Sequence, residues 1–280
     1  MLINPNQKEW EEKEIEFLKE NYIKMSREEL ANSLNRTKPS IQCKMRKLGL
    51  KKESVYFYDK NFFHKIDTEE KAYWLGFFYA DGYVIYNQKS RNYEVSIELS
   101  SKDREHLKKF NKNINGNVKV EDSERMAFDK LFTTSSIRLY SKEMATDLIN
   151  NNVVQNKTHS DIYPKILELE KNLRRHFIRG FFDGDGCITI SNKKYGYIKM
   201  DFTSINKNIL EDIRNYLFDE YDIKSSIHEE KIVGISKEIR HRLCFYGKYN
   251  TLNFGNLIYD NSNIFLDRKY NLFKRMTKDI

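Results

Sequence analysis

Within the first fifty residues, apolar side chains recur at the spacing expected of three short helices. The first apolar stripe runs through residues 15–22, in a stretch rich in acidic residues. Ser26, followed three residues later by Glu29, is typical of a capping box that opens a second helix. A third helix is expected to begin near Pro39, which a first helical turn tolerates, and to end at Gly49. The pattern predicts a small all-α domain.

Farther along the chain, one apolar nonapeptide occurs twice. Residues 74–82 and 178–186 are identical at five of nine positions and lie 104 residues apart. An alternating strand follows each copy, and the next strand contains Glu98–Ser101 in the first copy and Asp201–Ser204 in the second. A helix, two further strands and closing helices then follow in both copies. We therefore expect one α+β domain over residues 67–280, built from two similar αββαββα halves.

The amino-acid composition indicates what kind of partner the chain binds. The chain has 280 residues with 49 Lys plus Arg against 41 Asp plus Glu, which gives a net charge of +8 and favours a polyanionic partner. Eighteen Phe and 18 Tyr provide many large side chains to bury, so overall disorder is excluded. The three cysteines are far apart, which suggests neither a disulfide framework nor a thiolate zinc site.

The same features predict where the protein acts. The start of the chain lacks the layout of a secretory signal, and the longest apolar uncharged run, residues 72–80, is far shorter than the ~20 residues of a membrane span. We expect a soluble, cytoplasmic protein encoded by a bacterium or a phage, with an organellar origin left open.

A reversal of charge marks the amino-terminal domain. Residues 1–30 have a net charge of −3, whereas residues 31–52 have a net charge of +7. A basic third helix fits a recognition helix, whose outer face meets phosphates and base edges. The outward candidates for DNA binding are Ser40, Gln42, Lys44, Arg46 and Lys47. The stretch from Trp10 to Leu50 also resembles the helix-turn-helix modules of bacterial and phage DNA-binding proteins. The alternative is a basic face that is only solvated.

The two nonapeptides resemble the paired LAGLIDADG motifs of single-chain homing endonucleases, and the strand and helix pattern extends over most of residues 70–275. One copy alone is often only a core helix that ends in Asp-Gly, but two copies at matched spacing make the resemblance specific. It implies a pseudo-twofold nuclease domain. The expected organisation is a helix-turn-helix domain over 1–52, a linker over 53–66, a first half over 67–165 and a second half over 166–280.

The residues of the two copies indicate a metal site without reference to the family. Each copy carries small residues four positions apart, and these are Gly76, Ala80, Gly180 and Gly184. Small residues on one helix face allow two helices to pack backbone to backbone. If the two helices pair, Asp81 and Asp185 meet at two negative helix ends, where the carboxylates repel unless a cation bridges them. Oxygen ligands of this kind suit Mg²⁺.

The resemblance implies the same assignment. In the family, the acidic position matched by Asp81 and Asp185 binds the catalytic metals, which here would be Mg²⁺ or Mn²⁺, with Ala80 and Gly184 beside them as further ligands. The sixth motif position departs from the family pattern because it is Tyr79 in one copy and Asp183 in the other. The position is usually structural in the family, so catalysis is retained as the expectation while the symmetry of the two half-sites is left open.

Further site residues follow from the resemblance and from the strands. Lys157 and Lys269 look like the lysines that stabilise the transition state in family active sites. Ser101 and Ser204 occupy positions where the family often places a polar group near the metal-bound water. Polar residues that alternate along the strands, and cations in the turns between them, are expected to contact DNA. These candidates are Lys89, Arg91, Glu98, Thr189, Lys193, Lys194, Lys199 and Asp201.

The resemblance thus implies a monomeric, site-specific homing endonuclease that makes metal-dependent breaks in both strands of a long DNA target and leaves short 3′ extensions. Two alternatives remain open. Some bacterial sporulation regulators combine a degenerate LAGLIDADG domain with a helix-turn-helix and bind DNA without cutting it. An RNA-splicing maturase uses the same fold. The presence of both Asp81 and Asp185 favours the nuclease.

Overall fold

The computed structural model describes residues 9–50, 56–127, 130–154, 162–192, 197–231 and 239–277. The chain forms two compact units, Met1–Tyr56 and Phe57–Ile280. Among the described residues, no helix combines the length and the apolar character needed to cross a membrane.

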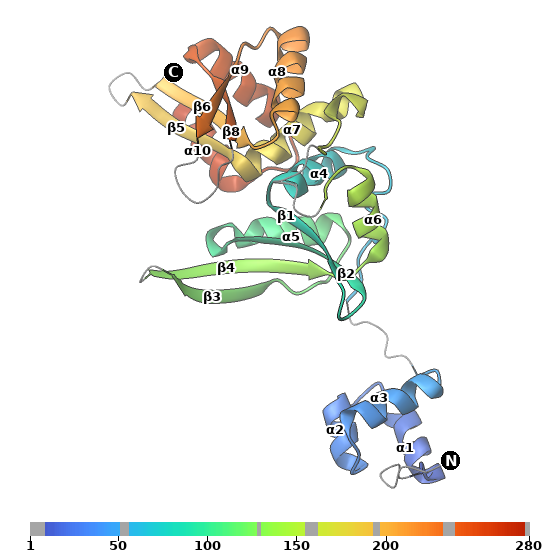
Figure 1. Ribbon diagram of the computed structural model, residues 1–280. Coiled ribbons are helices and arrows are strands. Elements are labelled where there is room, and N and C mark those ends of the chain that lie inside the picture. Colours follow the sequence, from blue (N-terminus) through green and yellow to red (C-terminus); the bar gives the residue numbers. More distant parts are fainter. Residues whose placement is uncertain are drawn as a thin grey trace. The chain divides into compact units, whose positions relative to one another are not determined.

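The first unit contains the three helices that the apolar pattern predicts (Figure 1). They are α1 (Glu12–Asn21), α2 (Arg27–Ser33) and α3 (Lys38–Lys47). The predicted capping box is present, because the Ser26 hydroxyl accepts from the Glu29 amide and the Glu29 carboxylate accepts from the Ser26 amide. Thr37 caps α3, and Gly49 follows its end with a φ of +68°. The buried core of this unit consists of Leu18, Leu30, Ala31, Ile41 and Met45.

The second unit consists of two halves with the same order of elements. The first half contains α4 (Glu69–Asp81), β1 (Gly82–Asn87), β2 (Asn92–Ser100), η1 (Ser101–Asp103), α5 (Arg104–Asn113), β3 (Glu121–Ala127), β4 (Lys130–Leu139) and α6 (Lys142–Asn150). The second contains η3 (Ile166–Glu168), α7 (Lys171–Asp185), β5 (Gly186–Asn192), β6 (Tyr197–Ser204), α8 (Lys207–Tyr221), β7 (Ser226–Lys231), β8 (Ile239–Phe245), α9 (Gly247–Tyr259) and α10 (Asp267–Thr277). The predicted α+β repeat is therefore confirmed.

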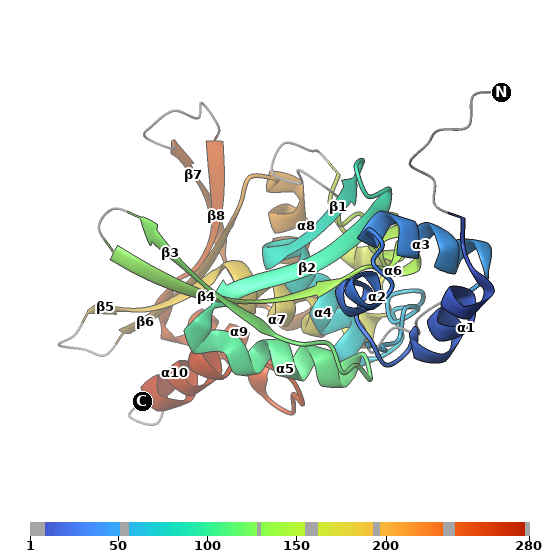
Figure 2. The same cartoon turned by 90° about the horizontal axis from the view of Figure 1, so that it is seen from below.

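Each half builds one antiparallel sheet of four strands. The strand orders are β1-β2-β4-β3 and β5-β6-β8-β7. Helices α5 and α6 pack against the first sheet, and α8 and α9 pack against the second. Figure 1 shows the two sheets as separate layers with α4 and α7 side by side between them, and Figure 2 gives the same arrangement seen from below. The motif helices thus lie at the centre of the unit.

Two details differ from the sequence-based expectation. Residues 57–66, expected within a linker, belong to the second unit, where Phe62 and Phe63 are buried in the core against Phe78 and Phe110. Two adjacent phenylalanines expose too much apolar surface to stay in water, so this segment packs.

The strand registers also differ from the expected match of residues 98–101 with 201–204. Gly82 pairs with Ile97, and Gly186 pairs with Phe202. Counted from the motif glycines, Ile97 is thus the counterpart of Phe202, and Leu99, not Ser101, is the counterpart of Ser204. A register shift between Ile190 and Asn192, typical of a β-bulge, adds a residue to the second hairpin.

Candidate active site

Helices α4 and α7 touch backbone to backbone through the small residues of the two motifs. A methyl group added at Gly76 would overlap the carbonyl oxygen of Phe177, and one added at Gly180 would overlap that of Tyr73. At Gly184 it would overlap Ala80. Only residues without a side chain, or with a very short one, allow this approach.

The close packing places both motif aspartates at one end of the helix pair. Asp81 is the last residue of α4 and Asp185 is the last residue of α7. A methyl group at Gly184 would lie 3.3 Å from Asp81 Oδ2, so the carboxylate of α4 lies directly beside the end of α7. Two carboxylates at two helix carboxyl termini experience mutual repulsion and the negative helix dipoles, and a cation at this position relieves both.

Lys269, at the start of α10, meets the same end of α7. Its side chain is buried, and its ammonium donates to the carbonyl oxygens of Phe182, at 2.8 Å, and Gly184, at 3.0 Å. Burial lowers the pKa of Lys269, while the carboxylates of Asp183, Asp81 and Asp185 oppose this effect. The lysine is therefore close enough to both motif aspartates to interact with their charge.

The chemistry of these donors fits a hard divalent cation. Asp81 and Asp185 supply carboxylate oxygens, and a carbonyl oxygen such as that of Gly184 has a second lone pair besides the one that Lys269 uses. Among the described residues, no group of three or more His, Cys, Asp or Glu side chains is arranged to hold a metal ion. A metal here would thus rely on two carboxylates, backbone carbonyls and water.

The sixth motif positions have different surroundings in the two halves. Asp183 is 1% exposed and accepts from the Tyr73 hydroxyl at 2.8 Å, the Tyr259 hydroxyl at 2.8 Å and the Leu266 amide at 2.7 Å. Burial raises the pKa of Asp183. Tyr79 instead packs against Phe181, and burial raises its pKa to about 12. Asp183 therefore fastens the segment that leads into α10, whereas Tyr79 packs against the other motif helix and its hydroxyl interacts with Ser204.

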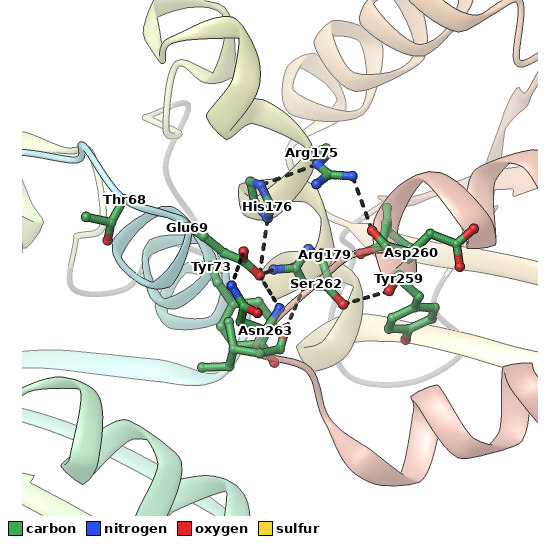
Figure 3. A network of polar contacts seen from close by, with 12 residues as sticks. Thr68, Glu69, Tyr73, Arg175, His176, Arg179, Tyr259, Asp260, Ser262 and Asn263 are labelled. Carbon is green, nitrogen blue, oxygen red and sulfur yellow. Dashed lines mark hydrogen bonds and ion pairs between the residues drawn. The ribbon is translucent and has the colours of Figure 1, made fainter.

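A second buried network, which the sequence interpretation missed, connects the two halves at the other end of α4 (Figure 3). Arg179 is fully buried and donates to the carbonyl oxygens of Ile264, at 2.7 Å, and Ile258, at 2.9 Å, and to Glu69 Oε1 at 2.7 Å. The Asn263 amide also donates to Glu69 Oε1, at 2.7 Å. The signal in the sequence is an arginine inside an otherwise apolar stretch of the second motif, since a buried charge requires a partner.

A cavity of about 330 Å³ opens beside Asp185. Its lining includes Tyr79, Ala80, Asp185, Thr203, Ser204 and Arg240. Ser204, a predicted site residue, is thus placed next to a motif aspartate. Ser101, the other predicted serine, instead forms a 2.6 Å hydrogen bond with Thr133. Arg240 was not among the predicted residues, because nothing in its local pattern marks it. Lys157 lies outside the described residues.

The predicted DNA contacts on the sheets fall into three groups. Lys89 and Arg91 lie exposed in the turn between β1 and β2, and Thr189 is exposed on β5. Asp201 is 6% exposed and lies 3.3 Å from Lys199 and 3.7 Å from Arg242, so its carboxylate is engaged within the sheet. Lys193 and Lys194 lie outside the described residues.

Glu98, another predicted DNA contact on a strand, belongs to an acidic cluster. Glu98 lies 3.9 Å from Arg138, which is also 3.6 Å from Glu94 and 3.6 Å from Glu121. All four side chains are partly exposed to solvent. This face of the first sheet therefore combines three carboxylates with one guanidinium.

The candidates on α3 differ in exposure. Gln42, Arg46 and Lys47 are exposed, and Ser40 and Lys44 are half-buried. The ring of Trp10 lies 4.0 Å from the guanidinium of Arg36 and 5.5 Å from the ammonium of Lys44. Arg36 also forms an ion pair with Glu14 at 2.7 Å. Part of the basic run thus stabilises the first unit itself, and DNA binding by α3 stays a prediction.

A comparison of the chain with protein families also matches one segment in each half. A profile described as a LAGLIDADG-like domain matches residues 68–126 and 172–259, which together exceed half of the chain. The chain belongs to the LAGLIDADG-like family. Each matched segment of this LAGLIDADG-like chain includes one motif helix, α4 or α7, and the strands that follow it.

Two uncharacterized proteins of Methanocaldococcus jannaschii are related to this LAGLIDADG-like chain. MJ0314 is 26% identical over 166 residues, which are 59% of either chain. MJ0398 is 22% identical over 179 residues, 64% of this chain and 58% of the relative. The chain thus matches about three fifths of the length of these relatives.

Solved structures are also similar to this chain, and the first of them shares its fold. The homing endonuclease I-WcaI bound to its DNA recognition sequence has a TM-score of 0.53 at 12% identity, and the match covers 75% of this chain and 91% of that one. A variant of I-DmoI in complex with nicked target DNA in the presence of manganese has a TM-score of 0.46 at 16% identity, covering 73% and 99%. Full-length DUF199/WhiA from Thermatoga maritima has a TM-score of 0.45 at 18% identity, covering 79% and 64%.

Proposed function

We propose that the chain is a monomeric, site-specific DNA endonuclease that makes metal-dependent breaks in both strands of a long target. The observation that carries the proposal is the pair Asp81 and Asp185 at the joined ends of α4 and α7, with the ammonium of Lys269 beside them. Such paired carboxylates are costly for a structure and suit a catalytic metal.

The residues of the site divide the work of phosphodiester hydrolysis. Asp81 and Asp185 would hold Mg²⁺ or Mn²⁺, which when bound supplies an activated water and stabilises charge on the phosphate. Lys269 keeps a positive charge at the carboxyl end of α7 and ties the start of α10 to that end. Ser204 contributes a hydroxyl to the lining of the cavity beside Asp185.

The remaining parts of the chain would bind the target. The net charge of +8 favours a polyanion, and the exposed cations of the β1–β2 turn are long enough to reach phosphates. I-WcaI, which shares the fold, is bound to its DNA recognition sequence. The first unit would add contacts through the exposed residues of α3.

The decisive experiment is Mg²⁺-dependent linearisation of a plasmid library by the purified full-length protein, followed by sequencing of the cut ends. Asp81→Asn and Asp185→Asn should each abolish double-strand cleavage while DNA affinity is kept or improved, because a negative charge is removed. Asp219→Asn, an exposed change on α8, should cut like the wild type.

The outcomes separate the alternatives. Cleavage by either aspartate variant at the full rate would overturn the proposed site. Specific DNA binding without cleavage by the wild type would support a regulator, and splicing of a bound RNA would support a maturase.

A further inference from the structure

The cavity beside Asp185 contains one basic side chain among its lining residues, and that side chain is Arg240. Arg240 lies at the start of β8 and is exposed, and none of the described residues is seen to bond its guanidinium. By contrast Arg242, two residues along the same strand, is within 2.8 Å of Glu230. An arginine that pairs with none of the described residues, in the same cavity as a carboxylate that is expected to hold a metal, is available to an oxyanion.

The first half has no basic residue at the equivalent position. Ser204 pairs with His241, which directly follows Arg240. In the first half, Leu99 is the counterpart of Ser204 and pairs with Ser135. The residue directly before Ser135 is Thr134, so the counterpart of Arg240 is an uncharged side chain.

We infer that Arg240 contacts the scissile phosphate at the half-site of Asp185, and that the DNA strand served by this half-site is cut first. The inference rests on the proposed endonuclease function and deepens it. Hydrolysis forms a P–O bond to the oxygen of water, breaks the bond to the leaving oxygen, and leaves a phosphate on one fragment and a hydroxyl on the other.

Negative charge builds on the phosphoryl oxygens and the leaving oxygen during that step. A guanidinium already in place stabilises this charge more in the transition state than in the bound substrate, and so raises the rate. The half-site of Asp81 lacks this group, because Thr134 offers only a hydroxyl. The two strands should therefore be cut at different rates by a domain whose fold is nearly twofold.

The test uses full-length protein and a duplex that carries a site recovered from the plasmid library, with a different label on each strand. Single-turnover rates are measured in Mg²⁺ at saturating protein, so that changes in affinity do not contribute. Arg240→Thr introduces the residue of the first half, Thr134→Arg makes the reciprocal change, and Arg240→Lys keeps the charge. Arg214→Thr is the control, because this arginine on α8 bonds only its neighbour Asn215 among the described residues.

We expect the wild type to cut one strand faster than the other. Arg240→Thr should slow that strand about tenfold or more, since loss of one charge-stabilising group can cost about 10²–10³ in rate, and should change the other strand less than about twofold. With Arg240→Thr, the nicked duplex that accumulates would no longer be the one in which the faster strand of the wild type is cut. Thr134→Arg should accelerate the second strand, Arg240→Lys should keep most of the first strand's rate, and the control should match the wild type.

Equal slowing of both strands, or no change in Arg240→Thr, would overturn the inference while the endonuclease function stands. A wild-type protein that cuts neither strand would overturn the proposed function and this inference together.

Discussion

Helices α4 and α7 contact each other through the same backbone positions, but the side chains next to those positions differ between the two helices. At the contact itself, Gly76 and Gly180 are identical. One residue earlier, Leu75 in α4 corresponds to the buried Arg179 in α7, and at the sixth motif position Tyr79 corresponds to Asp183. In α4, Leu75 is buried in the core and Tyr79 packs against Phe181, whereas Arg179 and Asp183 of α7 bond the segment that leads from α9 into α10.

The difference shows which positions the fold constrains. Where two backbones touch, any side chain collides, so the residue type is dictated by sterics. Residues next to the contacting glycines point toward other neighbours. A charged side chain is tolerated there if the neighbours supply a partner. In α7 the charges hold the segment that delivers Lys269 to the site.

The polar faces of the two sheets differ in a similar way. Counted from the paired motif glycines, Glu94 corresponds to Lys199 and Glu98 corresponds to Thr203. The partners across the next strand are Ser136 in the first sheet and Arg242 in the second. The first face is therefore the more acidic of the two at matched positions, and the second offers the stronger attraction to phosphates.

Gly180→Leu should have the largest effect on the protein. A branched side chain at this position collides with the backbone carbonyl of Tyr73, so the helices must separate. We expect a loss of more than about 4 kcal/mol in the free energy of unfolding, measured by urea denaturation. The control Asn215→Leu, at an exposed position of α8, should change stability little. A stable Gly180→Leu protein would show that the two helices do not touch here.

Arg179→Met should destabilise the second unit by about 3 kcal/mol, because the partly buried Glu69 loses its cation and two buried carbonyl oxygens lose their donor. The matched change in the other half, Leu75→Met, keeps volume and polarity and should cost less than about 1.5 kcal/mol. Urea denaturation of both variants measures the difference. Equal losses would mean that the Glu69–Arg179 pair does not distinguish the halves.

His106 makes the first half sensitive to acid. Its Nε2 lies 2.9 Å from the Tyr73 hydroxyl, which donates its proton to Asp183, so Nε2 of the ring is the donor to Tyr73. Burial lowers the pKa of His106 to about 3. Between pH 6.5 and pH 3, His106 is therefore protonated in the unfolded chain but not in the folded one. Stability falls as the pH drops from about 6.5 toward 3.

At pH 5, about 1.5 pH units below the unfolded pKa of histidine, His106 should lower the free energy of unfolding by about 2 kcal/mol. In α8 the matching buried position is Ile209, so His106→Ile tests the comparison directly. Denaturation at pH 7 and pH 5 should show a smaller acid loss in the variant. His176, whose pKa burial also lowers to about 3, supplies the acid loss that remains. An unchanged acid loss would contradict the role of His106.

Removal of residues 1–56 should weaken DNA binding without ending cleavage. The second unit keeps its own core and both motif aspartates, so its saturated cutting rate should stay close to that of the full chain. If α3 contacts phosphates, the salt dependence of binding should flatten by about 0.9 per lost contact, and the footprint should shorten at one end. An unchanged footprint would mean that the basic helix is only solvated.

Glu98→Thr should have the smallest effect. The change gives the first sheet the residue of the second and removes one carboxylate from the cluster around Arg138. Non-specific DNA affinity at low salt should rise about two- to threefold, since an exposed charge contributes little. Thr203→Glu should lower the affinity by a similar factor. A filter-binding titration in 50–200 mM salt checks both.

The sequence indicated more of the fold than of the site's surroundings. The repeat of residues 74–82 and 178–186 predicted the two halves, and the small residues within them predicted the helix contact, because both are local patterns. The match of residues 98–101 with 201–204 differs from the strand register by two positions, and the residue added in the second hairpin accounts for one of them. The linker was placed too far along the chain because the burial of Phe62 and Phe63 depends on partners distant in sequence.

By itself, the sequence determined the helix spacing, the cap at Ser26, the duplicated motif and the two aspartates that end it, because each depends on residues within a few turns of one another. Only the tertiary structure decided that Asp183 and Arg179 hold the approach to Lys269, and that Arg240 shares a cavity with Asp185. A buried polar side chain is stable only beside its partner, and the partners of Arg179, Asp183 and Lys269 lie 76 to 110 positions away in the chain.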